Sequence, residues 1–160
     1  MNEVNKNLYR PCVGILLVHP NGKIFVGERI DAPGNWQMPQ GGIEFGENPI
    51  NAAKRELVEE TGIKTVKYIA TSRKIHKYDL PEKYRKISWD GRYLGQSQIW
   101  TAFHFLGTEK EINLVHSEPE FSNWKWTNPD QAISEVVDFK QAIYQEIFTE
   151  FSQIINLIKK

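Results

Sequence analysis

The sequence has a single cysteine and no long apolar run, and each absence excludes a class of protein. Cys12 cannot form an internal disulfide, which excludes a small secreted domain held together by disulfides. A membrane-spanning helix needs about 18 or more consecutive apolar residues, and no such run occurs. The N-terminal residues 1–7 also lack the apolar core of a signal peptide. We therefore expect a cytoplasmic protein without a membrane segment.

An excess of charge of one sign is missing too, because 20 Lys and Arg residues balance 20 Asp and Glu residues. Without net charge there is no general attraction for polyanions, so nucleic-acid binding must depend on a few well-placed basic and aromatic side chains. The histidines show no zinc-ligand spacing: His19, His76, His104 and His116. The chain has 160 residues and no internal repeat, so residues 1–160 are expected to form one domain.

The most informative segment runs from Gly41 to Ile63. A glycine-rich loop leads into Asn48 and Pro49, a favourable N-cap followed by a favourable first helical residue. Gly62 is suited to end the helix, because glycine readily adopts the left-handed conformation. The segment therefore predicts a helix of about three turns over residues 49–61.

This predicted helix has two unlike faces. At roughly 100° of rotation per residue, one side of the helix carries the apolar residues that we expect to pack on the protein core, namely Ile50, Ala53, Leu57 and Val58. The opposite side carries Glu56, Glu59 and Glu60. Like charges three and four residues apart repel each other, so a cation is expected to compensate them. Mg²⁺ prefers carboxylate oxygens and also accepts phosphate oxygens of a substrate. For an isolated glutamate pair, a solvated acidic face would be the simpler interpretation.

The glutamates belong to a longer pattern, in which residue types recur at fixed spacing: Gly41, Glu47, Arg55-Glu56-Leu57, Glu59-Glu60 and Gly62-Ile63. Segment 41–63 resembles a Nudix box with every defining position filled. The resemblance implies that the Gly41 carbonyl and the Glu56, Glu59 and Glu60 side chains bind metal, and that Glu47 and Arg55 brace the loop against the helix. A non-catalytic nucleotide-binding relative is disfavoured, because such a protein would be expected to have lost a box glutamate.

Alternating and apolar runs outside the box predict a sheet. The expected strands are 12–19 and 23–27, joined by a hairpin at Asn21-Gly22, then 36–39, 66–77 and 98–106, with another short strand before Trp126. A long polar and aromatic loop is expected over 79–95, and a final helix from about Phe139 to Leu157. These elements suggest a mixed sheet with helices on both faces, and the resemblance implies the α/β/α sandwich of Nudix proteins.

Further segments resemble one branch of that family, the bacterial RNA pyrophosphohydrolases and similar dinucleoside polyphosphate hydrolases. The matching pieces occur in order along the chain: Tyr9-Arg10-Pro11, 36–42, Tyr78-Asp-Leu-Pro81, Gly95 to Trp100, Pro119-Glu-Phe121 with Trp124 and Trp126, and Val136 to Lys140. The resemblance implies removal of pyrophosphate from 5′-triphosphorylated RNA, which leaves a 5′-monophosphate and promotes RNA decay. Hydrolysis of a dinucleoside polyphosphate such as diadenosine tetraphosphate is the alternative.

The candidate substrate-binding residues are Arg10, Arg29, Gln40, Tyr78, Phe139 and Lys140, and the resemblance implies that Phe139 and Lys140 contact the nucleotide beyond the triphosphate. A guanidinium group can hold phosphate oxygens, but a salt bridge with the nearby Asp31 is an equally good interpretation of Arg29. Tyr78 and Phe139 can stack on bases, although Phe139 also fits the apolar stripe of the last helix. Ile75, Ser97 and Ile99 depart from the aromatic and basic residues common in this branch, which weakens the expected hold on long RNA.

For catalysis the resemblance implies two or more Mg²⁺ or Mn²⁺ ions, with Glu120 as a further metal ligand or water activator. A glutamate is expected to accept the proton of the attacking water. We favour Glu56, with Glu60 or Glu120 as alternatives, because spacing does not separate proton transfer from metal binding. The sequence names no protein partner, and we expect a monomer.

Overall fold

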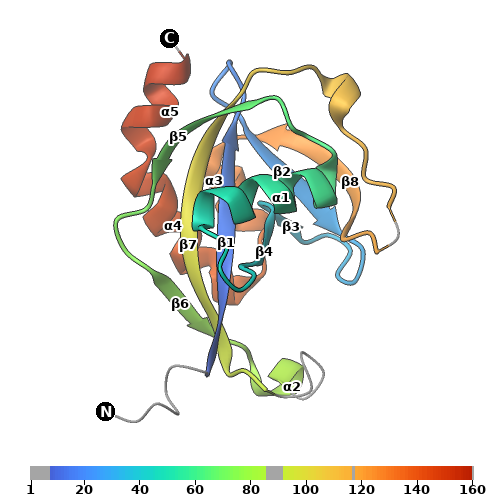
Figure 1. The fold of residues 1–160 in the computed structure, drawn as a ribbon, viewed down its shortest axis with the longest axis vertical. Coiled ribbons are helices and arrows are strands. Elements are labelled where there is room, and N and C mark those ends of the chain that lie inside the picture. Colours follow the sequence, from blue (N-terminus) through green and yellow to red (C-terminus); the bar gives the residue numbers. More distant parts are fainter. Residues whose placement is uncertain (1–7, 86–91, 117, 160) are drawn as a thin grey trace.

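The centre of the structure, a computed structural model that describes residues 8–85, 92–116 and 118–159, is one mixed sheet of eight strands (Figure 1). The strands are β1 (Tyr9–Val18), β2 (Ile24–Arg29), β3 (Trp36–Gln37), β4 (Gln40–Gly42), β5 (Val66–Thr71), β6 (His76–Asp79), β7 (Gly95–Phe105) and β8 (Phe121–Thr127). Five of them follow the order β3-β2-β1-β7-β5, while β4 pairs with β1, β6 with β7 and β8 with β2.

The two longest strands, β1 and β7, pair in parallel from Tyr9 opposite Gly95 to Val18 opposite His104, and the other pairs are antiparallel. The chain between these parallel strands contains the whole segment 41–63. This topology lays β4 directly against β1, with Gly41 opposite Val13. The glycine-rich loop therefore starts from the middle of the sheet.

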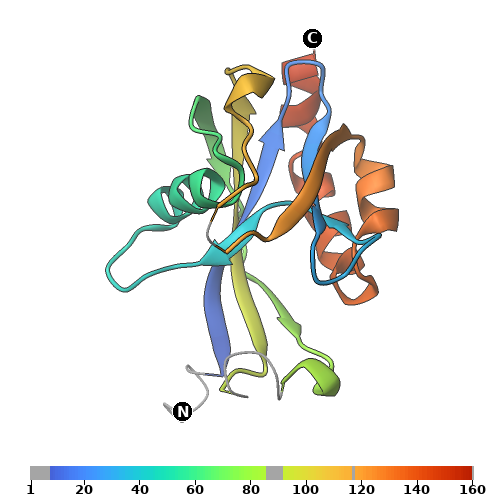
Figure 2. The ribbon, with the colours of Figure 1, turned by 90° about the vertical axis from the view of Figure 1, so that its right-hand side faces the viewer.

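Helices cover both faces of the sheet. They are α1 (Pro49–Thr61), α2 (Glu82–Arg85), α3 (Pro129–Glu135), α4 (Gln141–Glu150) and α5 (Ser152–Lys159), with short 3₁₀ turns η3 (Glu109–Glu111) and η4 (Asp138–Lys140). Figure 2 shows α1 on one side and α3, α4 and α5 on the other. Each side has its own buried cluster, one around Leu57 and Phe103 and the other around Trp100 and Tyr144. The expected α/β/α arrangement is therefore confirmed.

The local signals for α1 and the hairpin are confirmed in detail. The Asn48 side-chain oxygen accepts the Asn51 backbone N–H at 2.8 Å, and the Gly62 N–H donates to the Val58 carbonyl at 2.8 Å. Gly62 has φ +77°, the left-handed value expected of a residue that ends a helix. Gly22 in the β1–β2 turn has φ +87°.

Several predicted strand boundaries are wrong: β2 ends at Arg29 rather than Gly27, β3 at Gln37 rather than Pro39, and β7 starts at Gly95 rather than Gln98. β1 begins at Tyr9 rather than Cys12, because Tyr9 to Pro11 pair with the start of β7. The strand expected over 66–77 is two strands, β5 and β6, which pair with successive parts of β7. Ser72 interrupts them: its N–H donates to the Trp100 carbonyl, and its hydroxyl accepts the Trp100 N–H and donates to the Lys74 carbonyl.

The predicted final helix is also wrong in its limits. Phe139 lies in η4, α4 starts at Gln141, and the chain leaves regular helix at Phe151 before α5. Thr149 donates its hydroxyl to the Gln145 carbonyl and Ser152 to the Thr149 carbonyl, and such side-chain bonds compete with the helical pattern and bend helices. Among the described residues, none of the helices has the length and apolarity needed to cross a membrane.

Candidate active site

A cavity of about 1070 Å³ lies beside β4 and the C-terminal half of α1 and reaches to η4 and α2. Eleven residues expected in the site line this one cavity: Arg10, Arg29, Gln40, Gly41, Glu56, Glu59, Glu60, Tyr78, Glu120, Phe139 and Lys140. The brace residues Glu47 and Arg55 are not among the lining residues. Segments that are far apart in the sequence therefore meet in one cavity, which carboxylates, basic groups and aromatic groups line together.

The sequence-based division of α1 into faces is wrong at two residues. Val58, expected to pack, is 44% exposed, whereas Glu60, expected on the open acidic face, is only 7% exposed. The reason is helical geometry: Glu60 follows the buried Leu57 by three residues and shares its side, while Val58 is turned by roughly 100° from Leu57. Glu60 therefore lies on the buried side of α1, which faces the sheet.

Burial makes Glu60 the most perturbed acid of the site. Its pKa is raised well above the usual range, first by burial and then by the nearby carboxylates of Glu56 and Glu120, although a hydrogen bond from the Gln40 backbone opposes the shift. The Glu60 Oε2 atom is buried and has no hydrogen-bond partner among the described residues. An unpaired carboxylate oxygen in such a position is unfavourable unless something positive binds it.

Glu56 lies against the glycine-rich loop. A β-carbon at Gly41 would overlap the Glu56 carboxyl group, so only glycine leaves room for that side chain. The pKa of Glu56 is raised, chiefly by burial, while the hydrogen bond and charge of Arg55 oppose the shift. Glu59, by contrast, is exposed. The three box glutamates therefore occupy three different depths on one helix.

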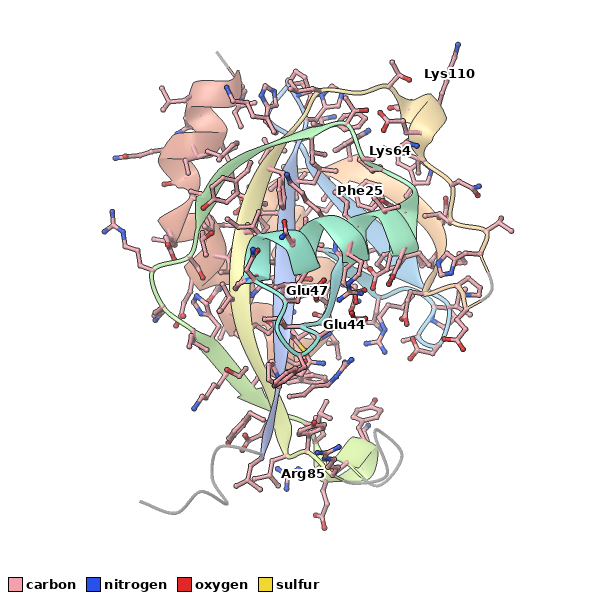
Figure 3. The ribbon with its side chains drawn as sticks, viewed as in Figure 1. Phe25, Glu44, Glu47, Lys64, Arg85 and Lys110 are labelled. Carbon is pink, nitrogen blue, oxygen red and sulfur yellow. The ribbon has the colours of Figure 1, made fainter. Side chains whose placement is uncertain are left out.

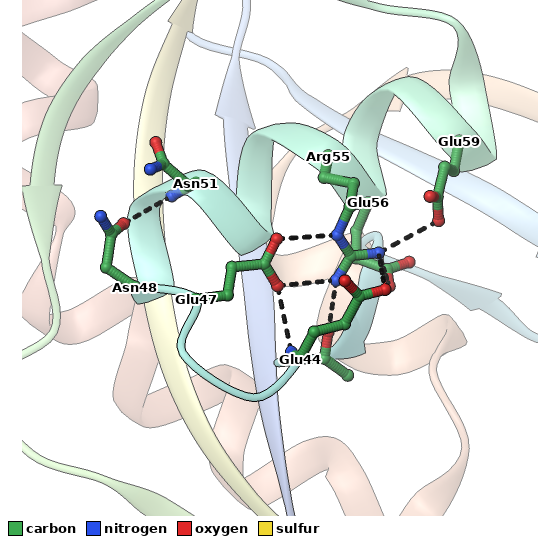
Figure 4. A network of polar contacts seen from close by, with 8 residues as sticks. Glu44, Glu47, Asn48, Asn51, Arg55, Glu56 and Glu59 are labelled. Atoms are coloured by element: carbon green, nitrogen blue, oxygen red, sulfur yellow. Dashed lines mark hydrogen bonds and ion pairs between the residues drawn. The ribbon is translucent and has the colours of Figure 1, made fainter.

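The brace predicted from the box is present and more extensive than expected (Figure 4). Arg55 Nε and Nη2 donate to the two Glu47 carboxylate oxygens at 2.8 and 2.9 Å, and Nη2 also donates to the Gly42 carbonyl at 2.8 Å. Its Nη1 donates to Glu56 at 2.9 Å and to Glu59 at 3.2 Å. Arg55 thereby holds the glycine-rich loop against α1. Two residues of this loop, Glu44 and Glu47, are labelled in Figure 3.

The donor set fits a hard divalent cation. The cavity wall offers a group of oxygen atoms from the Glu56, Glu59, Glu60 and Glu120 carboxylates and the Gly41 backbone, including the unpartnered buried Oε2 of Glu60. In the described part of the chain no three His, Cys, Asp or Glu side chains stand together as a ready-made metal site. Arg55 accounts for this in part, since its Nη1 group binds Glu56 and Glu59, which must turn away from it to reach an ion.

Glu120 approaches from a different element. It precedes β8, and its backbone carbonyl accepts the Ile30 N–H at 3.0 Å, which attaches this loop to the end of β2. The side chain is exposed, lines the cavity and raises the pKa of Glu60 through its charge. The loop therefore brings this carboxylate to the box glutamates, as its position in the sequence predicted.

The two arginines face the cavity in different states. Arg10 lies on Gly42, where a β-carbon would overlap its guanidinium group, and its positive charge acts on Glu56 to lower that pKa. Arg29 binds Asp31 with two hydrogen bonds, Nε to Oδ1 at 2.9 Å and Nη2 to Oδ2 at 2.6 Å. The Arg29–Asp31 salt bridge, which the sequence offered as an alternative to phosphate binding, is thus present. A phosphate would have to compete with Asp31 for Arg29.

Lys140 and Gln40 form a polar contact deep in the cavity. The Lys140 Nζ atom donates to Gln37 Oε1 at 3.2 Å and to Gln40 Oε1 at 3.4 Å, and the residue is only 5% exposed. Burial is the main cause that lowers the Lys140 pKa to about 7. Gln40 is held in turn by Gln96 and Gln98, each at 3.3 Å. Its side-chain oxygen is therefore fixed by surrounding donors.

The aromatic rings that line the cavity come from β6, η4 and α2. Tyr78 is 8% exposed and packs at 5.6 Å, between ring centroids, on the half-buried Phe139. Residues that were not predicted as site residues also touch this region, among them Tyr84, Gln96 and Gln98. Gln96 and Gln98 lie within the matching segment 95–100 and are two residues apart on β7, so strand alternation could have placed both on the cavity side. Tyr84 lies in α2, within a segment that was predicted to be a loop.

Comparison with known proteins agrees with this geometry. The family model of the NUDIX domain matches residues 8–149. An RNA pyrophosphohydrolase from Wolbachia pipientis subsp. Culex pipiens is 44% identical over 149 residues, which cover 92% of each chain. An RNA pyrophosphohydrolase from Novosphingobium aromaticivorans is 45% identical over 161 residues, which cover 97% of this chain and all of the relative.

Solved structures of lower identity share the fold. A C. elegans Ap4A hydrolase, crystallised as a binary complex, aligns with TM-score 0.63 at 16% identity over 89% of this chain and 98% of its own. The E. coli dihydroneopterin triphosphate pyrophosphohydrolase aligns with TM-score 0.63 at 20% identity over 86% of this chain and 96% of its own. The family match over most of the chain, and relatives well above 30% identity along nearly their whole length, show that this protein is a member of the NUDIX family.

Proposed function

We propose that the protein is a metal-dependent RNA 5′ pyrophosphohydrolase, which cuts a diphosphate bond at a 5′-triphosphate end and leaves a 5′-monophosphate. The observation that carries the proposal is the layout of the cavity. Four carboxylates, Arg10, Lys140 and aromatic rings line the same cavity, and the Arg10 charge acts on Glu56. A polyphosphate followed by bases matches this combination of groups, and the relatives of more than 40% identity are named RNA pyrophosphohydrolases.

In this proposal Glu56, Glu59, Glu60, Glu120 and the Gly41 carbonyl hold two or more Mg²⁺ or Mn²⁺ ions. When bound, such ions neutralise phosphate charge and make a bound water more acidic. Arg10 places its guanidinium beside Gly42, where it can bind phosphate oxygens and offset the charge that develops on the leaving group. Arg55 and Glu47 keep the glycine-rich loop and α1 in register, so the carboxylates stay aligned.

Glu56 is the favoured proton acceptor for the attacking water. It is half-buried, and burial raises its pKa from the ordinary range toward the region where a carboxylate accepts a proton most effectively. Glu60 is more deeply buried and Glu120 is exposed, so these alternatives are less well suited. Gln40, Lys140 and Phe139, which line the same cavity, are the proposed contacts of the nucleotide portion.

Hydrolysis of a dinucleoside polyphosphate is the second candidate. The cavity, at about 1070 Å³, lies at the upper end of the usual size range for small-molecule sites, so two nucleosides linked by phosphates could also be accommodated. We further propose that residues 1–160 act as one catalytic domain, monomeric and cytoplasmic.

Supplying triphosphorylated RNA and diadenosine tetraphosphate side by side to the purified protein with Mg²⁺ tests the proposal. We expect the specificity constant, kcat/KM, to be higher for RNA, with pyrophosphate or phosphate released and a 5′-monophosphate end formed. A higher kcat/KM for diadenosine tetraphosphate would make the second candidate the function. Turnover of neither compound, together with turnover of a nucleotide sugar or an oxidised nucleoside triphosphate, would reject both.

Gly41→Ala should strongly reduce turnover. Because the added β-carbon would overlap the Glu56 carboxyl group, the glutamate must move by an ångström or so, and a misplacement of that size costs about 100-fold in rate. Steady-state kinetics on triphosphorylated RNA would measure the loss. As a control, Glu56→Ala removes all of the overlapping atoms, since the Glu56 Cγ, Cδ and Oε2 atoms are the ones that meet the added β-carbon. Adding Gly41→Ala to Glu56→Ala should therefore change the residual turnover much less than adding it to the wild type.

A further inference from the structure

The rings beside the cavity form a graded series that leads outward. Tyr78 is 8% exposed, Phe139 is half-buried and Tyr84, on α2, is 39% exposed. The ring centroids of Tyr78 and Phe139 are 5.6 Å apart, and those of Phe139 and Tyr84 are 6.3 Å apart. Tyr84 also lines the cavity. The series therefore starts inside the site and ends at the surface.

Only the outer members of this series have ring surface to offer. Tyr78 is covered, with Phe139 on it and the Lys140 Nζ atom 5.7 Å from its centroid. The Tyr84 ring is tilted by 45° from that of Phe139, so the two rings form a wedge rather than a closed stack. The Lys83 Nζ atom lies 5.0 Å from the Tyr84 centroid. Such a contact at an exposed site is weak, so a base can replace it while the amine remains close to the backbone phosphate.

α2 is only four residues long and is closed by local hydrogen bonds, and it follows Leu80, whose N–H donates to the Leu94 carbonyl at 2.7 Å, next to the start of β7. The Arg85 Nε atom donates to the Leu80 carbonyl at 2.8 Å, and the Tyr84 N–H donates to the Pro81 carbonyl at 2.8 Å. Figure 3 shows Arg85 beside α2 at the end of the molecule away from α5. Tyr84 is thus presented on an anchored turn, which lowers the entropy lost when a ligand stacks on it.

We propose that Tyr84 is a binding site for a base of single-stranded RNA, one nucleotide beyond the base that stacks on Phe139. This inference rests on the proposed function and extends it from the triphosphate end to the following chain. Stacking of a base on an aromatic side chain is tolerant of sequence and is worth about 1–3 kcal/mol per base. Lys77, Lys83 and Arg85 face only Asp79 and Glu82 in this stretch, so the local surplus of positive charge is small and stacking supplies most of the affinity.

The site gives the enzyme a dependence on substrate length. If the first nucleotide carries the triphosphate and the second stacks on Phe139, a dinucleotide ends before Tyr84 and only a longer RNA reaches it. Tyr84 would therefore favour transcripts over very short triphosphorylated compounds, although the chain as a whole has no net charge to attract RNA.

The test compares wild type, Tyr84→Ala and the ring-preserving control Tyr84→Phe on a triphosphorylated dinucleotide and on a triphosphorylated RNA of about eight nucleotides. We expect Tyr84→Ala to lower kcat/KM on the longer RNA by about five- to 100-fold, mainly through KM, and to leave the dinucleotide unchanged. Tyr84→Phe should behave like wild type on both. Equal thermal unfolding temperatures would show that the variants are folded.

Two results would overturn the inference alone: Tyr84→Ala cutting the longer RNA as well as wild type does, or losing the same factor on both RNAs. Wild type that cuts neither RNA but does cut diadenosine tetraphosphate would overturn the proposed function itself. The two failures are therefore distinguishable in one set of assays.

Discussion

Replacing Glu60 by glutamine is expected to stabilise the metal-free protein and to disable it. At a pH above the raised pKa of Glu60, the change removes a negative charge that is 7% exposed, lies near Glu56 and Glu120, and has one oxygen without a partner among the described residues. Relief of one such buried charge is worth about 1–3 kcal/mol, which raises the melting temperature of a protein of this size by about 2–10 °C. The same change removes a proposed metal ligand, so kcat/KM on triphosphorylated RNA should fall by about 10²- to 10⁴-fold.

A higher melting temperature together with a lower kcat/KM distinguishes a functional role of Glu60 from a structural one. A residue needed only for folding would lower both the melting temperature and turnover when replaced. Glu109→Gln is a suitable control, because Glu109 is an exposed acid on η3 that is not among the residues lining the cavity. It should leave turnover unchanged. A Glu60→Gln variant that keeps wild-type turnover would remove Glu60 from the catalytic machinery.

Lys140→Met is expected to change how stability depends on pH. Lys140 is 5% exposed in the folded protein, and burial lowers its pKa from 10.5 to about 7. In the unfolded chain the amine keeps its ordinary pKa, so between pH 7 and 10.5 the unfolded state binds more protons than the folded state. Wild-type stability therefore gains up to about 1.4 kcal/mol per pH unit as the pH rises through this window, and methionine abolishes that gain.

Thermal unfolding of wild type and Lys140→Met at several pH values from below 7 to about 9.5 would measure this difference. The variant should be the more stable protein at the acidic end, where the folded wild type holds a buried charge, and its advantage should shrink as the pH rises. Lys67→Met, at an exposed position of β5, controls for the loss of a lysine. A stability difference between Lys140→Met and wild type that stays constant over this range would contradict the pKa assigned to Lys140.

Local sequence signals determined those elements whose form depends on a few adjacent residues. Asn48, Pro49 and Gly62 set both ends of α1, because capping and the left-handed conformation are properties of single residues. Asn21-Gly22 set the first hairpin in the same way. The box pattern also identified the carboxylates that the structure brings to one cavity, together with the Glu47–Arg55 brace.

The burial of individual side chains and the choice of their hydrogen-bond partners depended on the packing of the folded chain. Glu60 points under α1 while Val58 faces outward, which depends on where the sheet lies and not on the residue types alone. Arg29 resolves to a salt bridge with Asp31, and the buried position of Lys140 arises from η4 closing over Gln37 and Gln40. The Lys140 contacts join segments about 100 residues apart and have no local signature, whereas the Arg29–Asp31 bridge joins close neighbours and was one of two interpretations open from the sequence.

By itself, then, the sequence determined the family, the box helix and the chemistry of the acidic cluster, because these depend on residue types at short, fixed spacing. Only the tertiary structure decided that Glu60 is the buried acid, that the Lys140 amine is shielded from water, and that Tyr84 lies beside Phe139. Those properties depend on the low-dielectric surroundings built by β1, β4, β7 and η4, which come together from positions as far apart as Tyr9 and Lys140.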